Sequence, residues 1–132
     1  MAVLYSLKIS NFRCIEEFEH IFSNGITCII GRCDSGKTTI LEAISMVLSS
    51  NWKLSFYDSD FYNQNTSKPI IIEATITNLD EKLQTKYLYS LRGIDKFGRI
   101  RDDMENDEAE NFTTALTIRL QVNDDLETNW YL

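Results

Sequence analysis

The sequence predicts an α/β fold with a mixed sheet, and three neighbouring features carry this prediction. Residues 31–38 read G-x-x-x-x-G-K-[ST], the pattern of a phosphate-binding loop. Residues 26–30 before the loop form a short, almost wholly apolar run, which is typical of a parallel strand buried on both faces. Residues 37–50 after it carry apolar side chains at helical spacing. A strand, this loop and a helix, in that order, form the P-loop NTPase unit that binds a nucleoside triphosphate.

The chemistry of the loop indicates which residues hold the phosphates. Gly31 and Gly36 let the backbone approach and turn without a Cβ clash, so main-chain N–H groups can wrap a phosphate. We expect Lys37 to bridge β- and γ-phosphate oxygens, Thr38 to be a ligand of Mg²⁺, and Thr39 to donate to the α-phosphate. The alternative is a structural glycine turn with a solvated lysine. The predicted nucleotide-binding residues of the loop are Gly31, Arg32, Cys33, Asp34, Ser35, Gly36, Lys37, Thr38 and Thr39.

Composition narrows the class of protein. The 132 residues fit one domain, and the net charge of −7 argues against this segment forming a nucleic-acid surface by itself. Its 3 cysteines lack C-x-x-C spacing and accompany a single histidine, His20, so neither a disulfide framework nor a zinc site is indicated. The first ten residues alternate in polarity and include Lys8, which predicts neither a signal peptide nor a membrane span. We expect a cytoplasmic protein with reduced thiols and no membrane partner.

Alternating apolar and polar residues predict strands on both sides of the loop unit, mostly antiparallel in the second half. The predicted strands are residues 3–10, 18–22, 70–77, 116–122 and 127–132. A helix is expected from residue 80 to about residue 91, ended by Gly93 and Gly98.

Two further segments are expected to be irregular. Residues 51–67 should cross the domain with their aromatic side chains in the core, and the charge-dense residues 99–111 should form a mobile loop. On this basis residues 1–50 form a strand-loop-helix core. Residues 51–132 form an antiparallel β/α subdomain of the same unit.

Several acidic residues are candidates for catalytic or metal-binding groups. Hydrolysis requires an acidic residue at the end of a buried strand, and Glu73 is the nearest candidate, but the alternation places it on a solvated face. The pair at residues 124–125 fits a turn better. For the Asp-Ser-Asp triplet at residues 58–60, a turn or helix cap is favoured over a metal site. No catalytic residue is assigned.

Beyond these local patterns, the sequence resembles a known family. The likeness is to the start of an ABC-type ATPase head of the SMC/RecF-like group, and within it to the OLD-family ATP-dependent endonucleases. It is strong over residues 7–13 (LKISNFR), 31–39 and 40–44 (ILEAI), and weaker over residues 58–61, 70–77 and 116–130. The weaker stretches resemble the antiparallel subdomain that follows the phosphate loop in that family.

The resemblance implies a head lobe that binds Mg-ATP and acts on DNA, in DNA repair or antiviral defence. It implies a homodimer of heads, with ATP between one subunit's phosphate loop and the other's signature loop. The signature loop, an acidic-ended buried strand, a switch histidine and the nuclease segment are not found. We therefore expect an incomplete head, either a fragment or a truncated product, with DNA contacts in regions absent from it. Such a chain should bind Mg-ATP weakly and barely hydrolyse it.

Two residues gain specific expectations from the resemblance. It implies that Arg13 reaches the bound nucleotide, and the alternative is an exposed, ion-pairing arginine. Cys33 stands where relatives commonly carry asparagine, so we hypothesise thiol-sensitive nucleotide binding, against an inert side chain at a variable position.

Two other functions stay open. A small P-loop kinase or GTPase is disfavoured, because the guanine-reading N-K-x-D motif is absent and two strands precede the loop strand. A non-catalytic module that acts by association with a partner is the other alternative.

Overall fold

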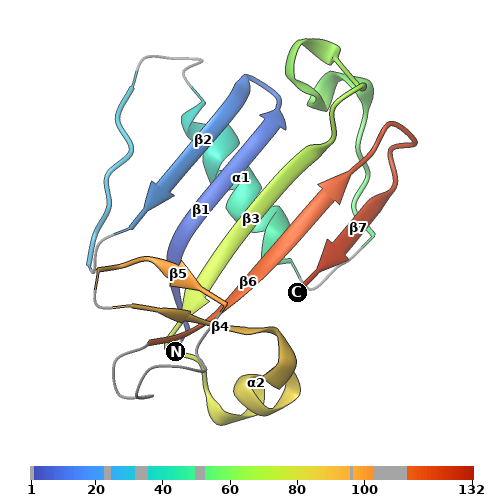
Figure 1. Cartoon of the computed structure of the whole chain (residues 1–132). Coiled ribbons are helices and arrows are strands. Elements are labelled where there is room, and N and C mark those ends of the chain that lie inside the picture. The colour runs from blue at the N-terminus through green and yellow to red at the C-terminus, as the bar shows by residue number, and fades with distance from the viewer. Residues whose placement is uncertain (1, 23–24, 32–35, 50–52, 96, 103–112) are drawn as a thin grey trace.

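One antiparallel sheet forms most of the structure, and helix α1 (Lys37–Val47) packs against one of its faces (Figure 1). The computed structural model describes residues 2–22, 25–31, 36–49, 53–95, 97–102 and 113–132. In this part of the chain the strand order is β2-β1-β3-β6-β4-β5, and β7 also pairs with β6. The strands are β1 (Val3–Phe12), β2 (Ile15–Ile21), β3 (Ile70–Thr77), β4 (Leu91–Ile94), β5 (Ile100–Arg101), β6 (Thr113–Val122) and β7 (Thr128–Tyr131). The shorter helices are α2 (Glu81–Lys86), η1 (Asp58–Asp60), η2 (Tyr62–Gln64) and η3 (Leu88–Ser90).

The register of the central strands separates an apolar face from a polar one. β3 pairs with β6 along its whole length, from Ile70 opposite Val122 to Thr77 opposite Ala115. Because side chains alternate between the faces of a strand, every second residue faces α1. The buried residues of this inner face include Leu7, Ile9, Ile70, Ile72, Ala74, Leu120 and Val122. The outer face carries a row of alternating charges, in which Glu19, Lys8, Glu73 and Arg119 stand opposite one another on β2, β1, β3 and β6.

Helix α1 buries one narrow stripe on the inner face. Ile40, Ala43 and Val47 are buried and recur at helical spacing, which is the pattern of an amphipathic helix. The small side chain of Ala43 lets the helix approach the sheet closely. Leu41 and Leu48 lie outside this stripe and are exposed. The apolar residues of α1 are therefore more numerous than its contact with the sheet requires.

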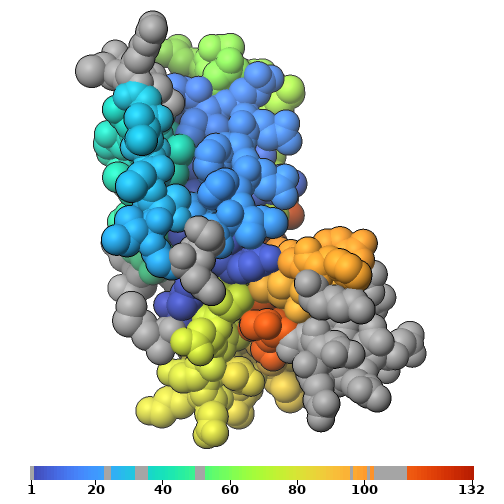
Figure 2. Space-filling view, turned by 90° about the vertical axis from the view of Figure 1, so that its left-hand side faces the viewer, coloured from blue at the N-terminus to red at the C-terminus, as the bar shows by residue number. Residues whose placement is uncertain are grey.

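The predicted strand at residues 26–30 is wrong. These residues have no regular secondary structure, and Ile26 and Ile30 are each 91% exposed. Figure 2 shows this segment, in light blue, at the surface of the molecule. A buried parallel strand needs parallel neighbours, and every strand pairing in the described residues is antiparallel. The apolar composition of residues 26–30 suits a buried segment, but none of the described residues covers Ile26 or Ile30.

The predicted helix at residues 80–91 is confirmed only in its first half. Asp80 caps α2 by accepting a hydrogen bond from the Leu83 N–H at 2.8 Å, but α2 ends at Lys86. Leu91 begins β4, where it stands opposite Leu116 of β6. Gly93 lies inside β4 instead of ending a helix, and this pairing with a distant strand overrides the local spacing.

The other expectations are largely confirmed. The predicted strands correspond to β1, β2, β3, β6 and β7, and α1 begins at Lys37 as predicted. In the irregular segment Phe56 and Phe61 are buried, whereas Tyr57 is exposed and does not join the core. Part of the predicted charged loop forms β5, and residues 103–111 of that loop lie outside the described residues. Within the described part of the chain, no helix has the length and apolar character needed to cross a membrane.

Two isoleucines test this packing. We expect Ile72→Ala to lower the free energy of unfolding by about 2–5 kcal/mol, because the side chain is fully buried in β3. Ile26→Ala removes the same atoms from an exposed side chain, so the loss should stay within about 0.5 kcal/mol. Urea denaturation followed by circular dichroism measures both values. Equal losses would show that residues 26–30 are packed as a strand in solution.

Candidate functional site: the phosphate loop and the start of α1

The N-terminus of α1 has the properties of an anion site. Among the described residues, which leave out positions 32–35, no side chain caps this end of the helix, and the first turn of α1 contains no acidic residue. The first N–H groups of a helix have no partner within the helix, and they form the positive end of the helix dipole. The start of this 11-residue helix, with no cap and no carboxylate among the described residues, is the kind of helix end that binds anions.

Gly36, which precedes α1, has a backbone and surroundings that only glycine suits. Its φ of 95° lies in the left-handed region, where a side chain is strained. A Cβ placed on Gly36 would lie 3.3 Å from Cys14 Sγ, which is tighter than ordinary van der Waals contact. A side chain at this position of the motif is therefore disfavoured by the left-handed backbone and by the close approach of Cys14 in the β1–β2 turn.

Lys37 and the two threonines present the polar atoms of the site. The Lys37 ammonium donates a hydrogen bond to the Gly31 carbonyl at 2.5 Å, which joins the two ends of the loop. Thr38 is exposed, and the Thr39 hydroxyl oxygen lies 3.7 Å from Cys14 Sγ. Arg32, Cys33, Asp34 and Ser35 lie outside the described residues, so their predicted contacts and the thiol hypothesis for Cys33 stay predictions.

A hollow of about 710 Å³ adjoins the loop, a volume in the range of small-molecule sites. Its wall is formed by the start of β2, by residues 29–31, by Lys37 and Ile40 of α1, and by Tyr62. A smaller apolar hollow of about 360 Å³ lies near the other end of α1, between Leu48 and Trp130. Of these two hollows only the larger contains the loop lysine, so we assign the candidate site to it.

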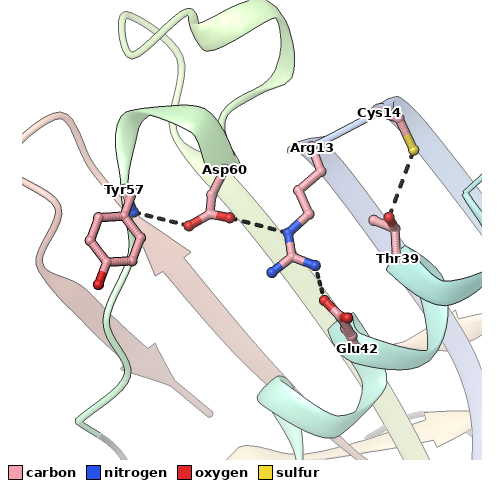
Figure 3. A network of polar contacts seen from close by, with 6 residues as sticks. All are labelled: Arg13, Cys14, Thr39, Glu42, Tyr57 and Asp60. Carbon is pink, nitrogen blue, oxygen red and sulfur yellow. Dashed lines mark hydrogen bonds and ion pairs between the residues drawn. The ribbon is translucent and has the colours of Figure 1, made fainter.

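Arg13 pairs with two carboxylates in this structure (Figure 3). Its Nε lies 3.1 Å from Asp60 Oδ1, and its Nη1 forms an ion pair with Glu42 Oε2. These contacts agree with the alternative interpretation of Arg13 as an ion-pairing arginine. A contact between Arg13 and a bound nucleotide stays a prediction. The other oxygen of Asp60 accepts the Tyr57 N–H at 3.0 Å, which confirms the prediction of a turn with a cap at residues 58–60.

The remaining acidic candidates lie away from the loop. Glu73 follows the buried Ile72 in β3, so it faces the side of the sheet opposite α1, and Arg119 Nε lies 3.6 Å from its Oε1. Asp125 accepts the Glu127 N–H at 3.0 Å and belongs to a turn, as predicted. Among the described residues, no three His, Cys, Asp or Glu side chains gather into a metal site. Thr38 therefore stays the predicted metal ligand.

Sequence reasoning missed Cys14 and Glu42. Cys14 lies 3.7 Å from Thr39, which is 25 residues away in sequence, and next to Gly36. Glu42 pairs with Arg13 from the second turn of α1. Neither residue belongs to a motif with a fixed spacing. The only local signal was the strong likeness of residues 40–44 to the family, which included Glu42 without giving it a role.

Comparison with known proteins decides the family. The chain matches the family described as "AAA ATPase domain" over residues 3–130. It belongs to this family. It is 40% identical to the OLD nuclease of Thermus scotoductus over 73 residues, which cover 53% of this chain and 14% of that protein. It is 32% identical to the DNA replication and repair protein RecF of Oenococcus oeni over 109 residues, which cover 74% of this chain and 29% of RecF. The chain thus spans less than a third of either relative.

A solved structure supports the same fold. It comes from work described as the structural biochemistry of ATP-driven dimerization and DNA-stimulated activation of SMC ATPases. The two chains align with a TM-score of 0.60 and 20% identity, over 97% of this chain and 68% of the other. This AAA ATPase domain is therefore similar in fold to an SMC ATPase, and parts of its sequence are similar to an OLD nuclease and to RecF. The resemblance to this group of ATPases is confirmed, and so is an α/β fold of the ABC-ATPase type. The predicted mixed sheet is wrong, because residues 26–30 form no strand and every strand pairing among the described residues is antiparallel.

Two glycines test the geometry at the loop. Gly36→Ala and Gly25→Ala both place a side chain on a left-handed backbone, with φ of 95° and 96°, so each should lose about 1–2 kcal/mol of unfolding free energy. Gly36→Ala should lose more, because its Cβ meets Cys14 Sγ, whereas a Cβ at Gly25 meets nothing within 4 Å. Combining Gly36→Ala with Cys14→Ala should recover the difference in a urea denaturation. A Gly25 variant as unstable as the Gly36 variant would contradict the contact.

Proposed function

We propose that this chain is the Mg-ATP-binding lobe of a DNA-acting ATPase. The observation that carries the proposal is the N-terminus of α1, which follows the left-handed Gly36, starts with Lys37 and has no cap from any described side chain. An uncapped helix end and a lysine at the mouth of the preceding loop together favour a polyphosphate over a neutral ligand. Membership of an ATPase family supports the same ligand class.

The residues of the site fit the proposed ligand. Lys37 would exchange the Gly31 carbonyl for β- and γ-phosphate oxygens, and charge-assisted hydrogen bonds of this kind are stronger than neutral ones. The exposed Thr38 hydroxyl would hold Mg²⁺, which commonly takes few protein ligands and keeps waters and phosphate oxygens. Bound Mg²⁺ would neutralise charge on the phosphates. The hollow beside Lys37 would take the nucleoside.

The action on DNA is proposed for the intact protein. The proposal that the intact protein acts on DNA is supported by two relatives, one called an OLD nuclease and the other a DNA replication and repair protein. The net charge of −7 disfavours direct contact of this lobe with a phosphate backbone, so we propose that DNA binds elsewhere. A homodimer of lobes would agree with the ATP-driven dimerization described for the SMC ATPases. DNA repair and antiviral defence are both open roles, and we propose a cytoplasmic location.

Nucleotide affinity tests the proposal. Lys37→Ala should weaken Mg-ATP binding about ten- to a hundredfold in isothermal titration calorimetry, because charged hydrogen bonds contribute about 1.5–3 kcal/mol. The matched control is Lys82→Ala, which removes an exposed lysine from α2 and should leave the affinity unchanged. If wild type and Lys37→Ala bound Mg-ATP equally, or neither bound it, the loop would not be a nucleotide-binding site. The non-catalytic alternative would then be favoured.

A further inference from the structure

The turn between β1 and β2 consists of Arg13 and Cys14, and both side chains contact α1. Cys14 Sγ lies 3.7 Å from the Thr39 hydroxyl oxygen, and Arg13 Nη1 forms an ion pair with Glu42 Oε2. Residues three apart lie on the same side of a helix, so Thr39 and Glu42 face the turn together. The turn therefore lies along the first two turns of α1, next to the end that carries the phosphate loop (Figure 3).

Asp60 holds Arg13 from the other side, through both its backbone and its side chain. The Arg13 N–H donates to the Asp60 carbonyl at 2.7 Å, and Arg13 Nε donates to Asp60 Oδ1 at 3.1 Å. Asp60 is itself fixed by the Tyr57 N–H. The guanidinium also lies over the ring of the fully buried Phe12, with its carbon 4.8 Å from the ring centroid. The side chain of Arg13 is thus oriented by its neighbours before it reaches Glu42.

Two observations show that neighbouring residues hold Arg13 in this position. Arg13 has a φ of 52°, a left-handed conformation that costs a non-glycine residue about 1–3 kcal/mol and persists only where neighbours enforce it. The Asp60 side chain is only 15% exposed, whereas that of Glu42 is 43% exposed. Asp60 is therefore the fixed anchor of Arg13, and Glu42 is the more accessible partner that joins it to α1.

We propose that Arg13, Asp60 and Glu42 act together as positioning residues for the phosphate loop. Asp60 fixes Arg13, and Arg13 holds α1 through Glu42, so the amides at the start of α1 and Lys37 keep one position relative to the β1–β2 turn. Arg13 affects the phosphates through the helix and does not touch them. This inference rests on the proposed function of the site as a nucleotide-binding loop.

The rival is a direct contact between Arg13 and the nucleotide, and the two predict opposite effects of Glu42→Gln. If Arg13 bound phosphate directly, Glu42 would compete with the ligand for the guanidinium, so removing its charge would leave binding unchanged or tighten it. If Arg13 acts through Glu42, the same change weakens binding. The sign of one measured change therefore separates the two roles.

The experiment is a double-mutant cycle on Mg-ATP affinity, measured by calorimetry with the full chain. We expect Arg13→Gln and Glu42→Gln each to weaken binding about three- to tenfold, and the double variant to bind no more weakly than the weaker single variant. Asp60→Asn should act in the same direction. Hydrogen–deuterium exchange without nucleotide supplies a second readout, in which the amides of residues 38–42 should exchange several-fold faster in both single variants.

The matched control is Glu73→Gln. It breaks a second Glu–Arg pair, between Glu73 and Arg119, which lies within the sheet on the face away from α1. A role in general stability would be shared by both pairs, whereas positioning of the loop belongs to Glu42 alone. We expect Glu73→Gln to leave the Mg-ATP affinity and the exchange of residues 38–42 unchanged.

The possible results are separable. A wild-type chain that binds no Mg-ATP would refute the proposed function. Normal wild-type binding that Glu42→Gln leaves unchanged or tightens would refute this inference alone. Additive losses in the double variant, or unaltered exchange in α1, would likewise show that Arg13 and Glu42 do not act through each other.

Discussion

The burial of one stripe of α1 against the inner face of the sheet is the constraint on which the rest of the site depends. Ile40, Ala43 and Val47 fix the axis and rotation of the helix, and this brings its N-terminus against Cys14 in the β1–β2 turn. The residue that precedes the helix is a glycine on a left-handed backbone, which leaves room for the Cys14 side chain. The first amides of α1, which no described side chain caps, and Lys37 are the groups that a phosphate needs.

Much of the fold could be predicted because it is encoded locally. β3 alternates apolar and polar residues from Ile72 to Thr77, and its bounds agree with the strand predicted from the sequence at residues 70–77. α1 was found because a motif fixes its start. Residues 26–30 were misjudged because burial of a parallel strand depends on neighbours that composition does not report. Residues 87–91 were misjudged because the pairing of β4 with β6, which begins at Leu91, depends on a strand that is distant in sequence.

The residues of the site likewise fall into those that the sequence alone predicts and those that only the structure brings together. The loop glycines, Lys37 and Thr38 belong to a motif with fixed spacing, so the sequence alone was enough to name them. The Arg13 network could not be named in this way, since it joins the β1–β2 turn, α1 and η1, which are distant in sequence. Arg13 itself was noticed only through the family likeness, and its partners decide whether it serves as a ligand or as a support.

The most direct test of this account is an amide-resolved NMR titration of the chain with Mg-ATP. The account predicts that the largest chemical-shift changes occur at the amides of Gly31 and residues 36–39, and that they saturate together. Smaller changes should reach Cys14 and Tyr62, which line the adjoining hollow. Changes confined to another surface, or no change at the start of α1 at saturating nucleotide, would contradict the claim that this helix end holds the phosphates.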